Sequence, residues 1–255
     1  MDANTTPQLG NCHDPLQVPE QFVVLPPEVS DDWTMSISTY QKIAKTTDKL
    51  PDTGLELTIL GLFGEVGSLL SALKKRQRDR AAFKRYNAII LEELGDVLWY
   101  FSNLASRAQL DLSTLSQRVF REIEDWDIVE PSEPNLVFGD MQSQVEKPVS
   151  EEAFSAQVLT LAGCVGDLLN DFKNDTFTRN RDKLSAHLVD IFRALVAAAD
   201  SAGVDMDAAA LGNLKKTFSR WPGEITYPPK IDADKPKKKR QPSHLEVFIA
   251  DEKNG

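Results

Sequence analysis

The chain is poor in cysteine, in long apolar runs and in strand patterns, and each shortage excludes a class of protein. Only two of its 255 residues are cysteines, Cys12 and Cys164, too few for a disulfide framework and typical of a reducing compartment. No stretch approaches the ~18 uninterrupted apolar residues of a membrane span. The N-terminal segment lacks the basic and then apolar regions of a secretion signal. We therefore expect a cytoplasmic protein with no membrane attachment.

Net positive charge is lacking too. The formal net charge is -10 at pH 7, which argues against non-specific binding of nucleic acid by the protein as a whole. One basic run, residues 235–240, lies in a Pro-rich tail and fits a solvated tail better than contact with a polyanion or a partner. The G-x-x-x-x-G-K loop of P-loop nucleotide-binding proteins is absent. The acidic balance is compatible with carboxylates gathered around a divalent metal.

Helical periodicity is what the sequence has in abundance. Apolar residues recur at steps of three and four, which predicts helices near 36–50, 55–78, 82–108, 111–126, 151–174, 180–202 and 205–220. The stripe of the second helix comprises Leu55, Ile59, Leu62, Val66, Leu69 and Leu73, and that of the third Ile90, Leu94, Val97, Phe101 and Leu104. Only 244–250 has a strand pattern. The predicted fold class is all-α.

Two parts of the chain resemble each other. LGLFGEVGSLL (60–70) aligns with LTLAGCVGDLL (159–169) at an offset of 99, and residues 91–111 align with 185–205 at an offset of 94. The difference, 99 − 94 = 5, places a short insertion in the loop between the two helices of the first copy, where insertions are tolerated. We interpret the chain as two fused copies of one helical bundle, an intrachain pseudo-dimer.

This interpretation divides the chain into five parts. They are an extended N-terminal arm (1–34), a first repeat (35–130), a linker (131–149), a second repeat (150–222) and a Pro-rich, basic tail (223–255). A glycine pair keeps its register in both copies, as Gly64 with Gly67 and as Gly163 with Gly166. Because each helical glycine costs about 1 kcal/mol relative to alanine, we expect these pairs to permit close packing of a neighbouring helix.

Three carboxylates are candidates for a metal site. Glu65 lies beside the apolar stripe of its helix, and Glu93 and Asp96 lie three residues apart on one face of the next helix. Two antiparallel helices would bring all three together, and buried, unpaired charges cost several kcal/mol each. A hard divalent cation such as Mg²⁺ would compensate them. The alternative, in which each carboxylate pairs with a Lys or Arg of KKRQRDR, stays open on spacing alone.

The motifs GLFGEVG…LKK and EELGDVLWY resemble those of the MazG-like, all-α nucleoside triphosphate pyrophosphohydrolases. The resemblance covers about residues 36–126 and, more weakly, 150–222. It implies an E-x-x-E and an E-x-x-D motif on antiparallel helices, Mg²⁺ (or Mn²⁺) as cofactor, and cleavage of an NTP or dNTP to monophosphate and pyrophosphate. By this match Glu65, Glu93 and Asp96 are metal ligands and catalytic residues. The family's second glutamate falls on Ser68, which cannot replace a carboxylate.

The resemblance also implies substrate-binding residues. Lys74 and Lys75 align with family lysines, and Tyr100 or Trp33 is a candidate for stacking on the base. The family's last-helix pattern N-x-x-K-x-x-x-R is present in the second copy only, as Asn213, Lys216 and Arg220. At these positions the first copy has Val119, Glu122 and Trp126. In the second copy the acidic set is replaced by Cys164, Asp167, His187 and Asp190. The spacing of these four residues matches no known zinc pattern.

Because these losses are complementary, we expect one composite site, with acids from the first copy and Asn213, Lys216 and Arg220 from the second. The alternative for this trio is an ordinary solvated helix face. The expected function is Mg²⁺-dependent nucleotide pyrophosphohydrolysis. The rival is a catalytically weak or inactive nucleotide-binding or scaffolding subunit derived from such an enzyme. We further expect a homo-oligomer, a dimer of pseudo-dimers.

Overall fold

A computed structural model describes residues 35–51, 54–121, 136–145, 148–176 and 181–220 of the chain. All of them belong to one compact unit, Thr34–Gly255. Within these ranges the chain forms helices and no strand, so the predicted all-α class is confirmed there. The arm at 1–34, the strand pattern at 244–250 and the basic run at 235–240 lie outside the described residues.

The helices follow the predicted segments closely. The short 3-10 helix η1 joins the two longest helices of the first half, and an additional helix, α5, lies in the segment predicted to be an irregular linker (131–149). The bounds are α1 Ile37–Thr46, α2 Glu56–Asp79, η1 Arg80–Ala82, α3 Tyr86–Arg107, α4 Leu112–Arg121, α5 Phe138–Val145, α6 Glu151–Lys173, α7 Arg181–Ser201 and α8 Met206–Arg220.

Serine side chains begin two of these helices. The Ser36 hydroxyl accepts a hydrogen bond from the backbone N–H of Thr39 at 3.2 Å, and the Ser150 hydroxyl accepts one from that of Ala153 at 3.0 Å. Each satisfies an N–H group that has no partner within its helix. These caps explain why α1 begins after Ser36 and α6 after Ser150.

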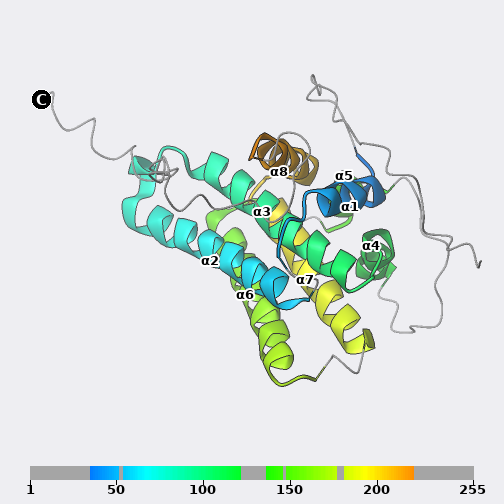
Figure 1. Cartoon of the computed structure of the whole chain (residues 1–255). Helices are drawn as coiled ribbons and strands as arrows, with labels where there is room; N and C mark the ends of the chain where they lie inside the picture. Colours follow the sequence, from blue (N-terminus) through cyan, green and yellow to red (C-terminus); the bar gives the residue numbers. More distant parts are fainter. Residues whose placement is uncertain (1–34, 52–53, 122–135, 146–147, 177–180, 221–255) are drawn as a thin grey trace, which may run out of the picture. The chain divides into compact units, whose positions relative to one another are not determined.

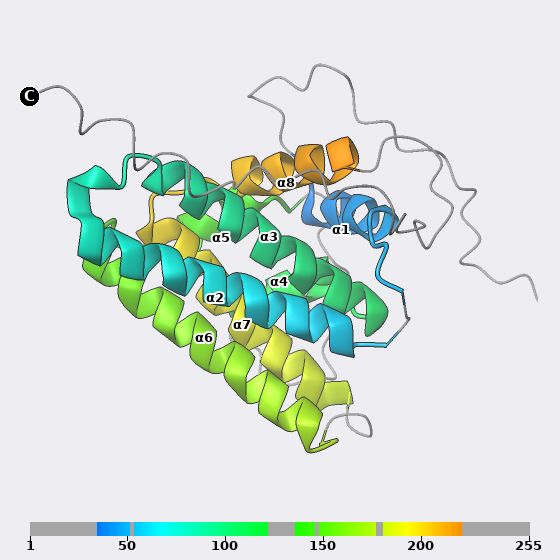
Figure 2. The ribbon, with the colours of Figure 1, turned by 60° about the vertical axis from the view of Figure 1, so that its left-hand side comes forward.

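The core lies between α2, α3, α6 and α7. Both predicted stripes are buried except for half-buried Leu55, which confirms the apolar faces of α2 and α3. Helices α2 and α3 run side by side in opposite directions, as do α6 and α7, and α2 also packs on α6 (Figures 1 and 2). The ring centroids of Phe101 on α3 and Phe192 on α7 lie 5.0 Å apart.

The linker segment packs because its helix is amphipathic. Phe138 is fully buried in α5, and its ring meets the rings of Tyr40 at 5.4 Å and Phe192 at 6.4 Å. This helix has only eight residues and lies in a segment with several prolines, so a search for periodicity, which needs a longer run, does not detect it. Helix α5 thereby connects α1 to α7.

The last helix of each half lies on the central helix of the other half. Helix α8 packs against α3, and α4 packs against α7 (Figure 1). Gly95 in α3 makes the first of these contacts possible, since an added Cβ would lie 2.6 Å from the backbone oxygen of Ala209 in α8. A methyl group at Gly95 would therefore push α8 away from α3.

The role expected for the repeated glycine pairs is wrong within the chain. An added Cβ on Gly64, Gly67, Gly163 or Gly166 would meet no atom within 4 Å, so no helix of the described part approaches them closely. These glycines lie on the outward side of α2 and α6, because the core side of both helices is taken by the apolar stripe. Close packing in this fold depends on Gly95 and, as shown below, on Gly61.

Helix α2 has one property that bears on location. The stretch Glu56–Ala82 is long and apolar enough to cross a membrane by length and composition alone. This is weak evidence for a span, because α2 packs against α3 and α6 as a core helix does.

Two glycine-to-alanine variants of α2 and α3 should have opposite effects on stability. Gly64→Ala should raise the free energy of unfolding by about 0.5–1 kcal/mol, since it adds helix propensity in open space. Gly95→Ala should lower it by about 1–3 kcal/mol, since the methyl group overpacks the α3–α8 contact. Urea unfolding followed by circular dichroism measures both. Equal effects of the two substitutions would contradict the packing described.

Candidate metal centre

Helices α2 and α3 bring the three predicted carboxylates together. One side-chain oxygen from each of Glu65, Glu93 and Asp96 can be chosen so that all lie within 4.8 Å of one another. Glu65 comes from the middle of α2, while Glu93 and Asp96 lie one helical turn apart on α3. Only oxygen ligands meet here, the set that Mg²⁺ and Mn²⁺ prefer. The cluster could therefore hold a divalent cation.

The electrostatics of this cluster are unfavourable for three ionised groups. Glu93 is only 7% exposed, and burial, followed by the charges of Glu65, Asp96 and Glu92, raises its pKa to about 7. Burial and the charge of Asp96 also raise the pKa of Glu65, against the opposing effects of Lys216, a hydrogen bond with Glu93, and Arg220. Carboxylates in this state bind a proton or a metal ion more readily than exposed ones.

Helix α8 supplies groups that face the same carboxylates. The Asn213 amide donates a hydrogen bond to Asp96 Oδ1 at 2.6 Å, and the Lys216 ammonium donates to Asp96 Oδ2. The same ammonium contacts Glu92 Oε1 at 3.1 Å. The structure therefore brings Asn213 and Lys216 from the second half onto an acidic residue of the first half.

A cavity of about 170 Å³ opens beside the cluster. Its wall combines acidic, basic, amide and aromatic side chains from α2, α3, α8 and the segment after α1. The lining residues are Thr47, Lys49, Leu50, Glu65, Asp96, Trp99, Tyr100, Asn213, Lys216, Thr217 and Arg220. Of the predicted site residues, Tyr100 and Arg220 thus join Glu65, Asp96, Asn213 and Lys216 around one cavity.

The aromatic wall depends on Gly61. An added Cβ at this position would lie 2.0 Å from Cε1 of Tyr100, so only glycine in α2 leaves room for that ring. Tyr100 packs edge-on against Trp99 with ring centroids 4.9 Å apart, and Trp99 Nε1 donates to Thr47 Oγ1 at 2.8 Å. Burial, then the charges of Glu65 and Asp96, raises the pKa of Tyr100.

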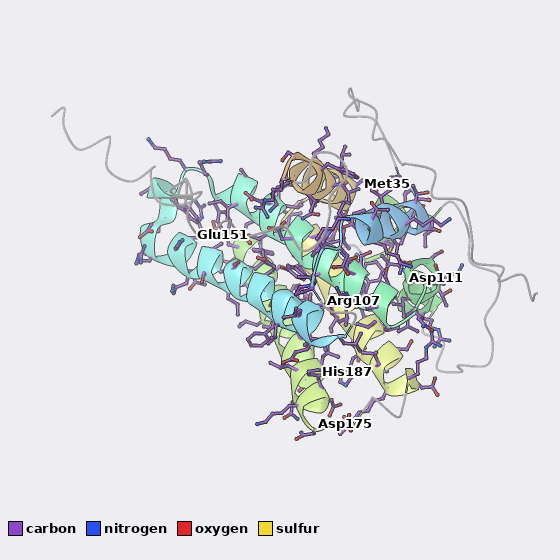
Figure 3. All side chains as sticks on the ribbon, viewed as in Figure 1. Met35, Arg107, Asp111, Glu151, Asp175 and His187 are labelled. Carbon is purple, nitrogen blue, oxygen red and sulfur yellow. The ribbon has the colours of Figure 1, made fainter. Side chains whose placement is uncertain are left out.

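The segment after α1 is fixed by a nearly buried ion pair. Arg107, in the last turn of α3 (Figure 3), contacts Asp48 at 2.7 Å and donates to the backbone oxygen of Gly54 at 2.7 Å. The side chains of Arg107 and Asp48 are 10% and 11% exposed, so the pair is little screened by solvent. It holds Lys49 and Leu50 at the cavity, residues that no motif in the sequence singled out.

Two predicted substrate-binding residues lie away from this cavity. Lys74 and Lys75 follow Glu65 by nine and ten positions on α2, a rise of about 14 Å, and neither lines the cavity. Lys74 is exposed on the outer side of the helix. The resemblance placed both lysines near phosphate, and the structure does not bring them to the acidic cluster.

The corresponding acidic positions of the second half are occupied differently. His187 (Figure 3) contacts Asp171 at 2.7 Å, and Asp190 contacts Arg193 at 3.1 Å. Burial, then the charges of Asp190 and Asp167, raises the pKa of the Cys164 thiol, which does not favour a nucleophilic thiolate. Among the described residues, Cys164, His187 and Asp190 form no cluster that could hold a metal.

Comparison with known proteins finds one informative similarity. The chain is 31% identical over 99 residues to the Gene 37 protein of Mycobacterium phage L5, and the match covers 87% of the phage protein and 35% of this chain. The chain belongs to the family of this phage protein. The name of the Gene 37 protein states no activity. No protein-family model matches the chain, and no solved structure matches it.

The raised pKa of Glu93 predicts a pH-dependent stability difference. Below about pH 4.5 this carboxyl is protonated in both the folded and the unfolded protein. As the pH rises toward 7, it ionises in the unfolded state first, which stabilises the unfolded state relative to the folded one. With divalent cations chelated, the free energy of unfolding of Glu93→Gln at pH 8 should therefore be higher than that of the unsubstituted protein, by about 1–3 kcal/mol. The gain should shrink as the pH falls to 4.5.

Chemical denaturation between pH 4.5 and 8 measures this difference. Glu56→Gln, which neutralises an exposed carboxylate at the start of α2, is the control for the loss of a negative charge. A gain from Glu93→Gln that stayed constant with pH would contradict the assignment.

Proposed function

We propose that the chain is a MazG-like nucleoside triphosphate pyrophosphohydrolase that uses Mg²⁺, or Mn²⁺, to cleave an NTP or dNTP to monophosphate and pyrophosphate. One observation carries the proposal. Asn213 and Lys216 of the last helix both bind Asp96 of the acidic cluster, so the acids and the phosphate-binding groups that the family combines meet here across the two halves. The ordinary solvated face considered for this trio does not account for the contacts of Asn213 and Lys216, whereas Arg220 is exposed.

Each group has a role in this reaction. Glu65, Glu93 and Asp96 would hold the cation, which supplies charge neutralisation and an acidified water. Lys216 and Arg220 would bind phosphate oxygens, and Asn213 would donate a hydrogen bond to them or orient Asp96. A water oxygen would bond to the α-phosphorus while the bond from that phosphorus to the oxygen shared with the β-phosphate breaks. Pyrophosphate would leave with that oxygen, and the proton of the water would pass to solvent. Tyr100 and Trp99 would border the base.

The proposal includes the internal repeat. Helix α8 lies on α3 as α4 lies on α7, and α2 pairs with α3 as α6 pairs with α7. These equivalent contacts support two fused copies that exchange their last helices. A single copy would then lack half of the composite site.

We also propose a homo-oligomer in the cytoplasm. Leu60 and Phe63 on α2 are 49% and 46% exposed, and Leu159 on the neighbouring α6 is 61% exposed. They lie beside glycines whose Cβ positions are open, which would suit helices of a second copy.

The rival function is a nucleotide-binding or scaffolding subunit with little turnover. Ser68 favours it, because it follows Glu65 by three positions on α2, where the resemblance expects a second glutamate. A serine hydroxyl does not supply the negative charge that a second cation would need.

Product analysis distinguishes these functions. With Mg²⁺ and a panel of NTPs and dNTPs, at least one nucleotide should yield monophosphate and pyrophosphate in equal amounts. Asp96→Asn should lower kcat by about 100-fold or more, since it removes a charged ligand. Asp190→Asn, at the corresponding position of the second half, is the matched control and should retain activity. Mg²⁺-dependent binding with no product from any nucleotide would favour the rival.

The composite character of the site has its own test. Arg220→Ala should raise KM for the nucleotide and lower kcat/KM by about 10- to 100-fold, because it removes a charge-assisted contact to phosphate. Lys215→Ala removes an exposed charge from the same helix and should change neither. Steady-state kinetics measure both. Unchanged kinetics for Arg220→Ala would show that α8 takes no part in substrate binding.

A further inference from the structure

Lys216 lies between two carboxylates that are one helical turn apart on the same face of α3. Its ammonium contacts Asp96 Oδ2 and, at 3.1 Å, Glu92 Oε1. The other oxygen of Asp96 accepts from Asn213 at 2.6 Å, so both oxygens of this carboxylate already accept from α8. Glu92 is the more exposed partner, with 41% of its side chain accessible against 18% for Asp96.

Lys216 also separates two cavities. The first, of about 170 Å³, is lined by Glu65 and Asp96 of the acidic cluster. The second, of about 290 Å³, is lined by Glu92, Leu91 and small residues of α3 and α8. Lys216 and Asn213 line both cavities. The flexible four-carbon stem of the lysine therefore has space on the Glu92 side as well as on the Asp96 side.

A divalent cation on Asp96 and an ammonium on the same carboxylate repel each other strongly at a separation of about 4 Å. The cation and the ammonium therefore weaken each other's binding to Asp96. Glu92 does not belong to the three-carboxylate cluster, so it does not compete for the cation in the same way. Glu92 can thus keep the lysine close to the site after Asp96 has been given up.

We propose that Lys216 is an exchangeable counter-ion, which neutralises Asp96 before a divalent cation binds and then transfers to Glu92, where it can meet phosphate. This inference rests on the proposed metal-dependent function and adds Glu92 to it as a positioning residue. The affinity of the cluster for metal is accordingly lowered by Lys216 and partly restored by Glu92.

Mn²⁺ titration of the whole 255-residue chain, followed by calorimetry and by the electron paramagnetic resonance of free Mn²⁺, tests the exchange without measuring turnover. Lys216→Met should bind Mn²⁺ about tenfold more tightly than the unsubstituted protein, because the competing charge is gone. Lys215→Met removes the same charge from the adjacent, exposed position and is the matched control. Circular dichroism verifies that each variant is folded.

A double-substitution cycle isolates the part played by Glu92. Glu92→Gln should weaken Mn²⁺ binding about threefold when Lys216 is present, since the ammonium then stays on Asp96. In the Lys216→Met background the same substitution should have little effect. A merely general loss of negative charge would weaken Mn²⁺ binding equally in both backgrounds.

The other outcomes separate this inference from the proposed function. Weaker or unchanged Mn²⁺ binding by Lys216→Met would overturn the exchange, because the lysine would then only hold Asp96 in place. An equal effect of Glu92→Gln in both backgrounds would overturn the role of Glu92. Either result, together with pyrophosphate release, leaves the proposed function standing. Absence of Mn²⁺ binding by every variant would overturn both.

Discussion

The repulsion among three carboxylates within 4.8 Å of one another is the constraint around which this structure is arranged. Burial raises the pKa of Glu93 to about 7, so the cluster favours a cation or a proton over three bare charges. Among the described residues, Lys216 of α8 contacts Asp96, and α8 comes this close to α3 because Gly95 has no side chain. Without that close approach, Lys216 would not contact Asp96, and the two halves of the chain would not share a cavity.

Much of this arrangement could be predicted from the sequence, because it depends on periodic patterns. Steps of three and four residues indicated helices, and the same steps placed Glu93 and Asp96 on one face. The complementary loss of motifs in the two copies predicted that Asn213 and Lys216 would meet the acids of the other half. The repeat itself and the catalytic activity stay predictions.

The rest could not be predicted, because it depends on contacts between distant residues. A glycine pair that keeps register indicates that glycine is needed, but not whether the neighbour lies inside the chain. The structure assigns close packing to Gly61 and Gly95 instead of Gly64. Lys49 reaches the cavity only because Arg107 binds Asp48, 59 residues earlier in the sequence, and no local pattern reports such a pair.

The two halves differ in how their ionised groups are compensated. In the second half, hydrogen bonds from Lys183 and then His187 lower the pKa of Asp171 to about 2, so this carboxylate is satisfied by its own surroundings. In the first half, the pKa of Glu93 is raised, and the Lys216 ammonium contacts two carboxylates, Glu92 and Asp96. Perturbed groups of this kind gather at functional sites, whereas satisfied ion pairs are typical of structural ones. The proposed duplication would allow such a division, in which one half keeps the acidic cluster and the other supplies the helix whose Lys216 and Asn213 contact it.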